Sequence, residues 1–242
     1  MKMYGGYSYL RKWTFYLRVG EDFLGATLRQ PSKETNDSIL YLHGWGGNRE
    51  TQAGLLDQLC EEGFYVLNFT QRGFDESTGK RCLNKWHLDA SYIADYLIKM
   101  GLKVWICGLS TGGTMAISTF NVNERIVGGI IISPFASLDQ LFKDKPERRQ
   151  RLQEIFGPFT EQDFRAADAL SKVSTIHPRP LLFICGDADD IIPSTHSKML
   201  SEKAGDSSTL ITIPKADHII STVPPIELSR TIKEWIAKKQ PD

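Results

Sequence analysis

The chain has 242 residues, 41% of them hydrophobic, and 29 Lys and Arg balance 29 Asp and Glu to a formal net charge of zero. Such a composition is typical of a globular protein with a substantial core, and its neutral balance argues against nucleic acid or an anionic membrane as a partner held by bulk charge. No window is apolar over the length of a bilayer-spanning helix, and we expect neither a secretion signal nor integral membrane association.

Short apolar runs with strand character alternate along the chain with segments of helical spacing. Two runs flanking Gly20-Glu21-Asp22 predict an opening hairpin over residues 13–30. Six further strands are predicted at 38–43, 64–69, 103–107, 126–133, 180–185 and 208–214. Helical spacing lies between most of them, and in the last segment one helical face is predicted to carry Ile226, Leu228, Ile232, Trp235 and Ile236. This alternation predicts an α/β fold with a mostly parallel sheet and helices on both faces.

The long gap from Pro134 to Pro178 departs from this alternation. It holds a helical pattern ending in "LQEIF" and a capping box at Thr160 and Asp163. We expect a small cap of two or three short helices, inserted at about 136–178 into a single domain that spans 1–242. Its basic residues are interpreted as a solvated helix face, with attraction of an acidic substrate as the alternative; they are Lys143, Lys145, Arg148, Arg149 and Arg151.

The four cysteines are Cys60, Cys82, Cys107 and Cys185, and their spacing forms neither a Cys-x-x-Cys unit nor a zinc-type cluster. Cys107 and Cys185 end apolar runs, where a reduced cysteine packs as a small hydrophobic residue. A reducing cytoplasm is the compartment that this usage predicts.

Chemically active side chains follow four of the predicted strands. The sequence "HGWGG" starts at His43, "GLSTGG" contains Ser110, "GDADDIIP" contains three carboxylates, and "KADH" ends at His218. The carboxyl ends of parallel strands meet at one edge of a sheet, where ligands bind. We therefore expect a hydroxyl, a carboxylate and an imidazole to meet there.

A serine hydroxyl needs an adjacent base, and the base needs an orienting carboxylate, before it becomes an effective nucleophile. Gly108 and Gly112 flank Ser110, as a sharp strand-to-helix turn requires. A second observation is that the serine, the aspartates and the histidine follow one another along the chain in the order Ser, Asp, His, which is the order of α/β-hydrolase triads. Together they predict a serine hydrolase.

On "YLHGWGG", "GLSTGG", "GDADDIIP" and "ADH", the chain resembles the α/β-hydrolases from about Trp13 to Trp235. It is most similar to compact-cap esterases and acylglycerol lipases, which grade into cinnamoyl esterases and serine aminopeptidases. The loop "QRGFDESTG" is similar to the family's Arg-Gly-x-Gly-x-Ser loop but departs from it, with Asp75 where glycine is usual and Thr70 where aspartate is common. The resemblance implies an eight-stranded sheet with the cap inserted after strand 6.

The resemblance also implies roles for individual residues. Ser110 is the expected nucleophile and His218 the general base, with the backbone N–H groups of Trp45 and Thr111 as the oxyanion hole. His43 is the rival base, but in the family's His-Gly motif this ring supports the loop. His87, His177 and His196 have no strand-end position and are expected on the surface or in helices.

The expected acid lies in a loop with Asp187, Asp189 and Asp190. The family pattern Gly-x-x-Asp-x-Ile/Val-x-Pro places the acid at Asp189, and the other two stay open as alternatives.

The expected reaction is hydrolysis of a small-molecule carboxylic ester with a short to medium acyl chain, and it requires no metal or organic cofactor. Trp45, Phe135, Phe142 and Phe156 are candidates for the acyl pocket, and each also suits ordinary core packing. A serine aminopeptidase or amidase and a feruloyl-type esterase are the alternatives, and a non-catalytic ligand receptor is a third. A haloalkane dehalogenase is disfavoured, because its nucleophile is an aspartate. The sequence leaves the natural substrate and the oligomeric state open.

Overall fold

The computed structural model describes residues 10–239. Within them, eight strands form one sheet in the order β1-β2-β4-β3-β5-β6-β7-β8. Neighbours from β4 to β8 are parallel, whereas β1/β2 and β2/β4 are antiparallel. The strands are β1 (Arg11–Val19), β2 (Asp22–Gln30), β3 (Asp37–Leu42), β4 (Tyr65–Phe69), β5 (Lys103–Leu109), β6 (Gly128–Ile132), β7 (Leu181–Gly186) and β8 (Ser208–Ile213). The predicted mostly parallel sheet and its opening hairpin are confirmed.

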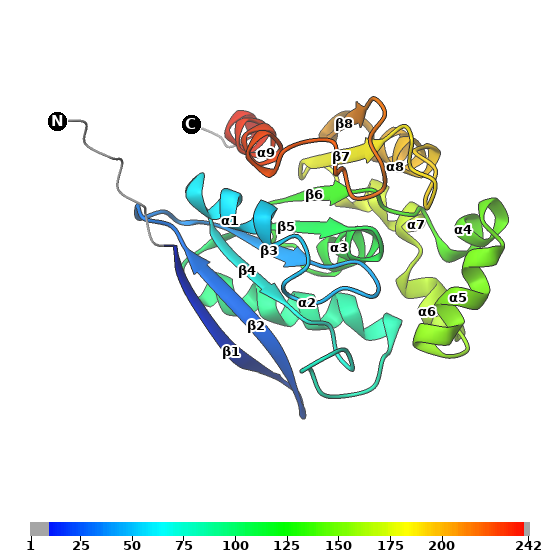
Figure 1. The fold of residues 1–242 in the computed structure, drawn as a ribbon, viewed down its shortest axis with the longest axis horizontal. Coiled ribbons are helices and arrows are strands. Elements are labelled where there is room, and N and C mark those ends of the chain that lie inside the picture. The colour runs from blue at the N-terminus through cyan, green and yellow to red at the C-terminus, as the bar shows by residue number, and fades with distance from the viewer. Residues whose placement is uncertain (1–9, 240–242) are drawn as a thin grey trace.

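Helices cover both faces of the sheet (Figure 1). Successive side chains of a strand point to opposite faces. Ile39 and Tyr41 of β3 accordingly join a buried cluster with α1 (Ala53–Glu61) and α9 (Pro225–Lys239). Leu40 and Leu42 join the other cluster, with α2 (Leu83–Lys99), α3 (Thr111–Val122) and α8 (Thr195–Ala204). No helix within residues 10–239 is long and apolar enough to cross a membrane.

Helix α9 corrects one detail of the predicted apolar face. Leu228, Ile232, Trp235 and Ile236 are buried, but Ile226 is 41% exposed. Ile226 and Leu228 are two residues apart, about 200° around a helix of 3.6 residues per turn, so they cannot point to the same neighbour.

The cysteines behave as their positions predict. Cys107 and Cys185 are buried inside β5 and β7, Cys60 is buried on α1, and all four cysteines are free thiols. Burial raises the pKa of the Cys107 thiol well above its usual range. Packing is therefore the role of Cys107 and Cys185.

The cap between β6 and β7 contains more helices than the two or three predicted. It comprises α4 (Leu138–Asp144), α5 (Glu147–Phe156), α6 (Glu161–Ala166), α7 (Ala169–Lys172) and the 3-10 turn η1 (Val173–Ile176). Side chains of Ser137, Thr160 and Asp168 each accept a hydrogen bond at a helix start, and both bonds of the predicted Thr160–Asp163 capping box are present. Each of these N-cap hydrogen bonds stabilises the start of a separate short helix. The insertion therefore contains more helices than predicted.

The cap lies beyond the ends of the central parallel strands (Figure 1). Asp163 Oδ1 accepts the backbone N–H of Asn84 at 3.0 Å, which links α6 to the start of α2. Ser118 Oγ donates to Ala166 O at 2.6 Å, which links α6 to α3. The cap is therefore fastened over the edge of the sheet at which the predicted site residues meet.

Candidate active site

Ser110 lies in the turn between β5 and α3, as its flanking glycines predict. Its backbone has φ 58° and ψ −124°, a strained conformation typical of a nucleophile turn. A Cβ on Gly108 would lie 2.3 Å from Gly112 O, and a Cβ on Gly112 would lie 2.2 Å from Leu42 O. Neither position has room for a side chain, so these glycines allow α3 to pass close to β5 and β3.

His218 follows β8 and forms a hydrogen bond with one of the three candidate acids. Its Nδ1 lies 2.7 Å from Asp189 Oδ2, and both side chains are buried. Asp189 Oδ1 accepts the backbone N–H groups of Ile191 and Ile192, each at 2.9 Å. Three hydrogen bonds thus fix the carboxylate, which in turn fixes the imidazole ring with Nδ1–H as the donor.

The other two carboxylates of this loop do not contact His218. Asp187 Oδ1 accepts the backbone N–H of Lys215 and so ties the loop after β7 to the loop after β8. Asp190 is exposed. The geometry therefore favours Asp189 as the acid, in agreement with the sequence pattern.

The second ring nitrogen of His218 is available for proton transfer. His218 Nε2 is buried and has no hydrogen-bond partner among residues 10–239, so the bond to Ser110 Oγ is not formed in this structure. Hydrogen bonds of this kind are often long before substrate binds and shorten in the reacting complex. Ser110 itself is 5% exposed, at the same edge of the sheet.

The expected oxyanion donors lie beside Ser110. Thr111 is the first residue of α3, so its backbone N–H has no partner inside the helix. The loop carrying Trp45 reaches Ser110 through Gly44, where an added Cβ would lie 3.2 Å from Ser110 Cβ. Trp45, Ser110 and Thr111 line one cavity. This arrangement places both residues at the predicted nucleophile.

His43 is committed to supporting the loop. Its Nδ1–H donates to Gly44 O at 2.6 Å, and its Nε2 accepts the backbone N–H of Gln71 at 3.0 Å. Burial lowers the pKa of His43 to about 4, so the ring is neutral at physiological pH. Because both ring nitrogens are occupied, His43 cannot act as the rival base.

The remaining histidines form no hydrogen bond with Ser110, Asp189 or His218 within residues 10–239. His87 lies on α2 and His177 is exposed after η1. His196 is buried on α8, where Nδ1 accepts the backbone N–H of Ala136 at 3.0 Å. His196 therefore helps to hold the start of the cap.

The loop after β4 explains how the chain tolerates its departures from the family pattern. Asp75 has φ 40°, in the left-handed region that glycine adopts without strain. Thr70 Oγ1 accepts the backbone N–H of Arg49 and donates to Glu76. Arg72 forms two 2.6 Å hydrogen bonds to Asp89. Side-chain hydrogen bonds thus hold this loop beside the strand edge.

Two of the four residues predicted for the acyl pocket line the cavity beside Ser110. Trp45 and Phe135 line it. Phe142 and Phe156 do not, which corrects that prediction, because they pack in an aromatic cluster with Phe159. The cavity offers about 10 Å³ to water, about what one water molecule needs. An acyl chain of several carbons therefore requires the cap side chains over it to move.

Five further residues line this cavity, and none of them was predicted as an acyl-pocket residue. They are Leu141, Arg148, Leu152, Ile191 and Ile192. The sequence names Arg148 among the basic residues of the cap, with attraction of an acidic substrate as one alternative. Arg148 lies four residues before Leu152, on the same face of the helix, and that spacing is the signal that could have placed it at the cavity. Ile191 and Ile192 directly follow the loop that carries the acid.

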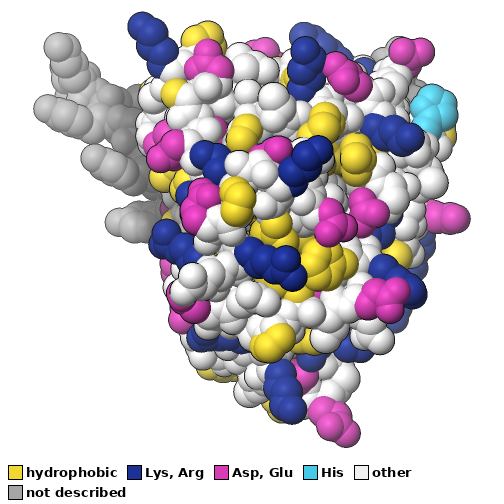
Figure 2. All heavy atoms as spheres, turned by 90° about the vertical axis from the view of Figure 1, so that its right-hand side faces the viewer, with side chains coloured by type: hydrophobic (Ala, Val, Ile, Leu, Met, Phe, Trp, Pro, Cys, Tyr) yellow, Lys and Arg dark blue, Asp and Glu magenta, His cyan; other side chains and the backbone are white. Residues whose placement is uncertain are grey.

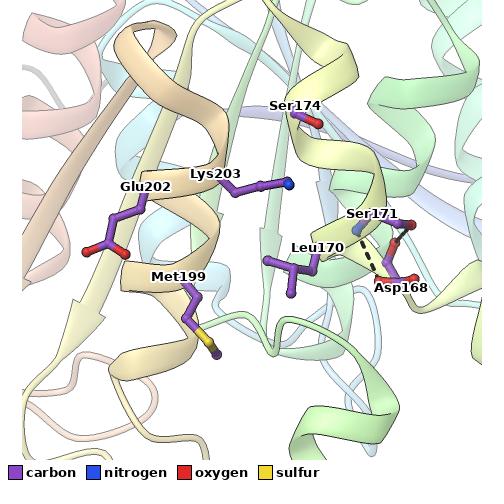
Figure 3. Close-up of a pocket in the computed structure, with 7 residues that line it drawn as sticks. All are labelled: Asp168, Leu170, Ser171, Ser174, Met199, Glu202 and Lys203. Carbon is purple, nitrogen blue, oxygen red and sulfur yellow. Dashed lines mark hydrogen bonds between the residues drawn. The ribbon is translucent and has the colours of Figure 1, made fainter.

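A wider hollow lies elsewhere, between α7 and α8. It measures about 710 Å³, is open to solvent, and is lined by Asp168, Leu170, Ser171, Ser174, Met199, Glu202 and Lys203. Figure 3 shows Lys203 reaching across it from α8 towards the side that carries Ser174. It contains no nucleophile with an adjacent base, so we place the active site at the smaller cavity.

Comparison with known proteins agrees with the α/β-hydrolase fold. The Hydrolase_4 family model, described as serine aminopeptidase, S33, matches residues 33–162, more than half of the chain. The chain is also 28% identical over 196 residues to the uncharacterized protein YfhR of Escherichia coli K12, and this match covers 78% of the chain. It covers 65% of YfhR, so the chain spans slightly less than two thirds of that relative's length.

Two solved structures share the fold along most of the chain. The Pyrococcus furiosus esterase Pf2001 has a TM-score of 0.79 at 19% identity, covering 100% of this chain and 97% of that one. Est1E from Butyrivibrio proteoclasticus with bound ferulic acid has a TM-score of 0.75 at 21% identity, covering 93% and 98%. At these identities the similarity establishes the fold alone.

Proposed function

This chain belongs to the serine aminopeptidase S33 family of α/β-hydrolases, and we propose that it is a carboxylesterase for short- to medium-chain esters. The observation that carries the proposal is the imidazole of His218, fixed by Asp189 at 2.7 Å with Nε2 left unpaired. It lies at the sheet edge where Ser110 occupies a strained turn. A base, an orienting acid and a nucleophile are the three groups that acyl transfer requires.

In the first half of the reaction, Ser110 Oγ attacks the ester carbonyl carbon while His218 Nε2 takes the hydroxyl proton. The N–H groups of Trp45 and Thr111 stabilise the charge on the carbonyl oxygen. His218 then protonates the leaving alkoxide, the carbon–oxygen bond breaks, and the alcohol departs from an acyl-enzyme. In the second half, water gives a proton to His218 and attacks the acyl carbon. The proton returns to Ser110 Oγ as the acid is released.

The cap supports the preference for short and medium acyl chains. Leu141 and Leu152 lie against the cavity and are buried in the main apolar cluster. Each methylene that enters apolar surroundings contributes about 0.8 kcal/mol at most, which must offset the displacement of these side chains. Activity should therefore rise with chain length and then fall steeply towards palmitate.

The charge of the cavity favours esters over aminopeptidase substrates. An aminopeptidase must bind the ammonium group at the start of a peptide, for which a carboxylate is the natural partner. The charged residue lining this cavity is a cation, Arg148. A cation repels an ammonium group, so the arrangement disfavours the aminopeptidase alternative. The four free cysteines suit the reducing cytoplasm that we propose as the compartment.

The test is a panel of p-nitrophenyl esters from acetate to palmitate, measured below micelle-forming concentrations. Methyl ferulate and aminoacyl p-nitroanilides are run beside it. We expect the highest kcat/KM on short to medium esters, with the anilides slower. Higher activity on the anilides would establish the amidase alternative, and higher activity on methyl ferulate the feruloyl alternative.

The receptor alternative is separated from the enzyme by fluorophosphonate labelling, because a serine without an activating base labels poorly. Absence of both labelling and hydrolysis would favour a ligand receptor.

A further inference from the structure

Arg148 on α5 is a cation that lines the cavity beside Ser110. Its guanidinium carbon lies 6.0 Å from the centre of the Trp45 ring. Within residues 10–239, Arg148 forms no ion pair, and its Nε–H is buried without a hydrogen-bond acceptor. The contact with Trp45 engages the face of the ring and leaves the guanidinium N–H donors unused.

Two other half-buried arginines of the chain have acceptors for their donors. Arg72 binds Asp89 through two hydrogen bonds and Asp22 through a third. Arg179 donates to three backbone carbonyls while stacking on Phe120. Arg29 and Arg49 each leave one buried nitrogen without a hydrogen bond, but both form ion pairs, with Asp57 and Glu76. Arg148 differs from them, since its donors face a cavity that contains the candidate nucleophile.

The surroundings of Arg148 favour an anion in the substrate. No carboxylate lines the cavity, and the remaining lining side chains are apolar except for Ser110 and Thr111. Figure 2 shows hydrophobic side chains gathered near the middle of the face that carries the cap, with Lys and Arg side chains beside them. A charge-assisted hydrogen bond is strong where water is excluded, and a guanidinium fits the two oxygens of a carboxylate.

We propose that Arg148 is a specificity residue that selects esters whose acyl part ends in a carboxylate, such as half-esters of short dicarboxylic acids. The inference rests on the proposed esterase function and narrows its substrate class. The carboxylate accepts the unpaired N–H groups of Arg148 while the ester carbonyl, a few carbons away, lies at Ser110. A neutral ester of the same length reaches Ser110 but leaves the cation without a partner.

The test compares two substrates of matched length, monoethyl glutarate and ethyl pentanoate, by the acid released at constant pH. We expect Arg148→Met to lower the ratio of their kcat/KM values, anionic over neutral, by about ten- to a hundredfold, as loss of a hydrogen bond to a charged group does. Arg148→Lys keeps the charge without the two-pronged geometry and should give an intermediate ratio. Arg149→Met is the matched control, because Arg149 is an exposed neighbour that stacks on Phe142 and does not line the cavity.

An unchanged ratio in Arg148→Met would overturn the inference, even if both substrates became slower, because a purely structural contact with Trp45 affects the two equally. Should Arg148→Met fail to fold, the ratio of the two kcat/KM values in Arg148→Lys replaces it, and an unchanged ratio in that variant would overturn the inference. Hydrolysis of ethyl pentanoate with no effect of Arg148 on the ratio would leave the esterase proposal intact. Hydrolysis of neither substrate, together with absence of fluorophosphonate labelling, would overturn both proposals.

Discussion

The Asp189→Asn substitution should greatly lower turnover, although asparagine has the same shape and number of non-hydrogen atoms as aspartate. Asp189 Oδ1 accepts two backbone N–H groups at 2.9 Å, and Oδ2 faces His218 Nδ1 at 2.7 Å. An asparagine keeps its carbonyl oxygen on the two N–H groups, because the reverse orientation loses two hydrogen bonds at about 1 kcal/mol each. Its NH2 group therefore points at Nδ1, which must then accept.

The consequence is a change of tautomer. His218 would carry its proton on Nε2, the atom that must take the proton of Ser110. In triads whose buried acid is neutralised in this way, turnover falls about 10⁴-fold, and we expect a similar loss for p-nitrophenyl butyrate. Asp187→Asn and Asp190→Asn are the matched controls and should stay within about tenfold of the wild type, since neither side chain contacts His218. A folded Asp189→Asn enzyme with turnover near the wild type would refute the assigned acid.

Three further outcomes follow from the same geometry. Gly112→Ala, whose Cβ would lie 2.2 Å from a backbone oxygen, should lower the free energy of unfolding by several kcal/mol in urea titrations, of order the largest single-residue effects. Gly54→Ala on α1, where the nearest atom would lie at 3.5 Å, should not. Leu152→Ala enlarges the cavity and should raise the octanoate-to-butyrate ratio of kcat/KM while lowering stability by about 2–5 kcal/mol; an unchanged ratio would mean that Leu152 does not limit chain length. Burial lowers the pKa of His43 from 6.5 to about 4, so the unfolded chain binds the proton first as pH falls, and stability decreases below pH 6.5. Between pH 7 and pH 5, His43 accounts for about 2 kcal/mol of the decrease in the free energy of unfolding. In urea titrations at the two pH values, this decrease should be smaller by that amount in His43→Gln than in the wild type. It should be unchanged in the exposed His177→Gln.

The strand-end residues could be predicted because parallel strands place their carboxyl ends at one edge, wherever they lie in the sequence. Ser110, Asp189 and His218 come from three different strands, and each directly follows a short apolar run. The choice among the three aspartates depended on a family pattern alone. A loop of three carboxylates has no periodicity, so only the hydrogen bond to His218 distinguishes Asp189 from its neighbours.

The cap could be predicted only as a set of helices. The aromatic residues of the gap are spaced for burial, but burial within the cap and burial against the active site produce the same pattern. Phe142 and Phe156 pack on other aromatic rings of the protein, whereas Leu152 and Arg148 face the cavity. Tertiary packing decides which face of α5 covers the site. Sequence periodicity predicts that a face is buried, but not what it packs against.

The mass of the protein after treatment with a fluorophosphonate shows whether Ser110 is an activated nucleophile. We expect wild-type protein to gain one phosphonyl group, mapped to Ser110 by peptide analysis, and to lose its esterase activity in proportion. Ser110→Ala should gain none and should hydrolyse p-nitrophenyl butyrate about a million-fold more slowly, as loss of a triad nucleophile does. Labelling at another residue, or substantial ester hydrolysis by a folded Ser110→Ala protein, would show that Ser110 is not the nucleophile.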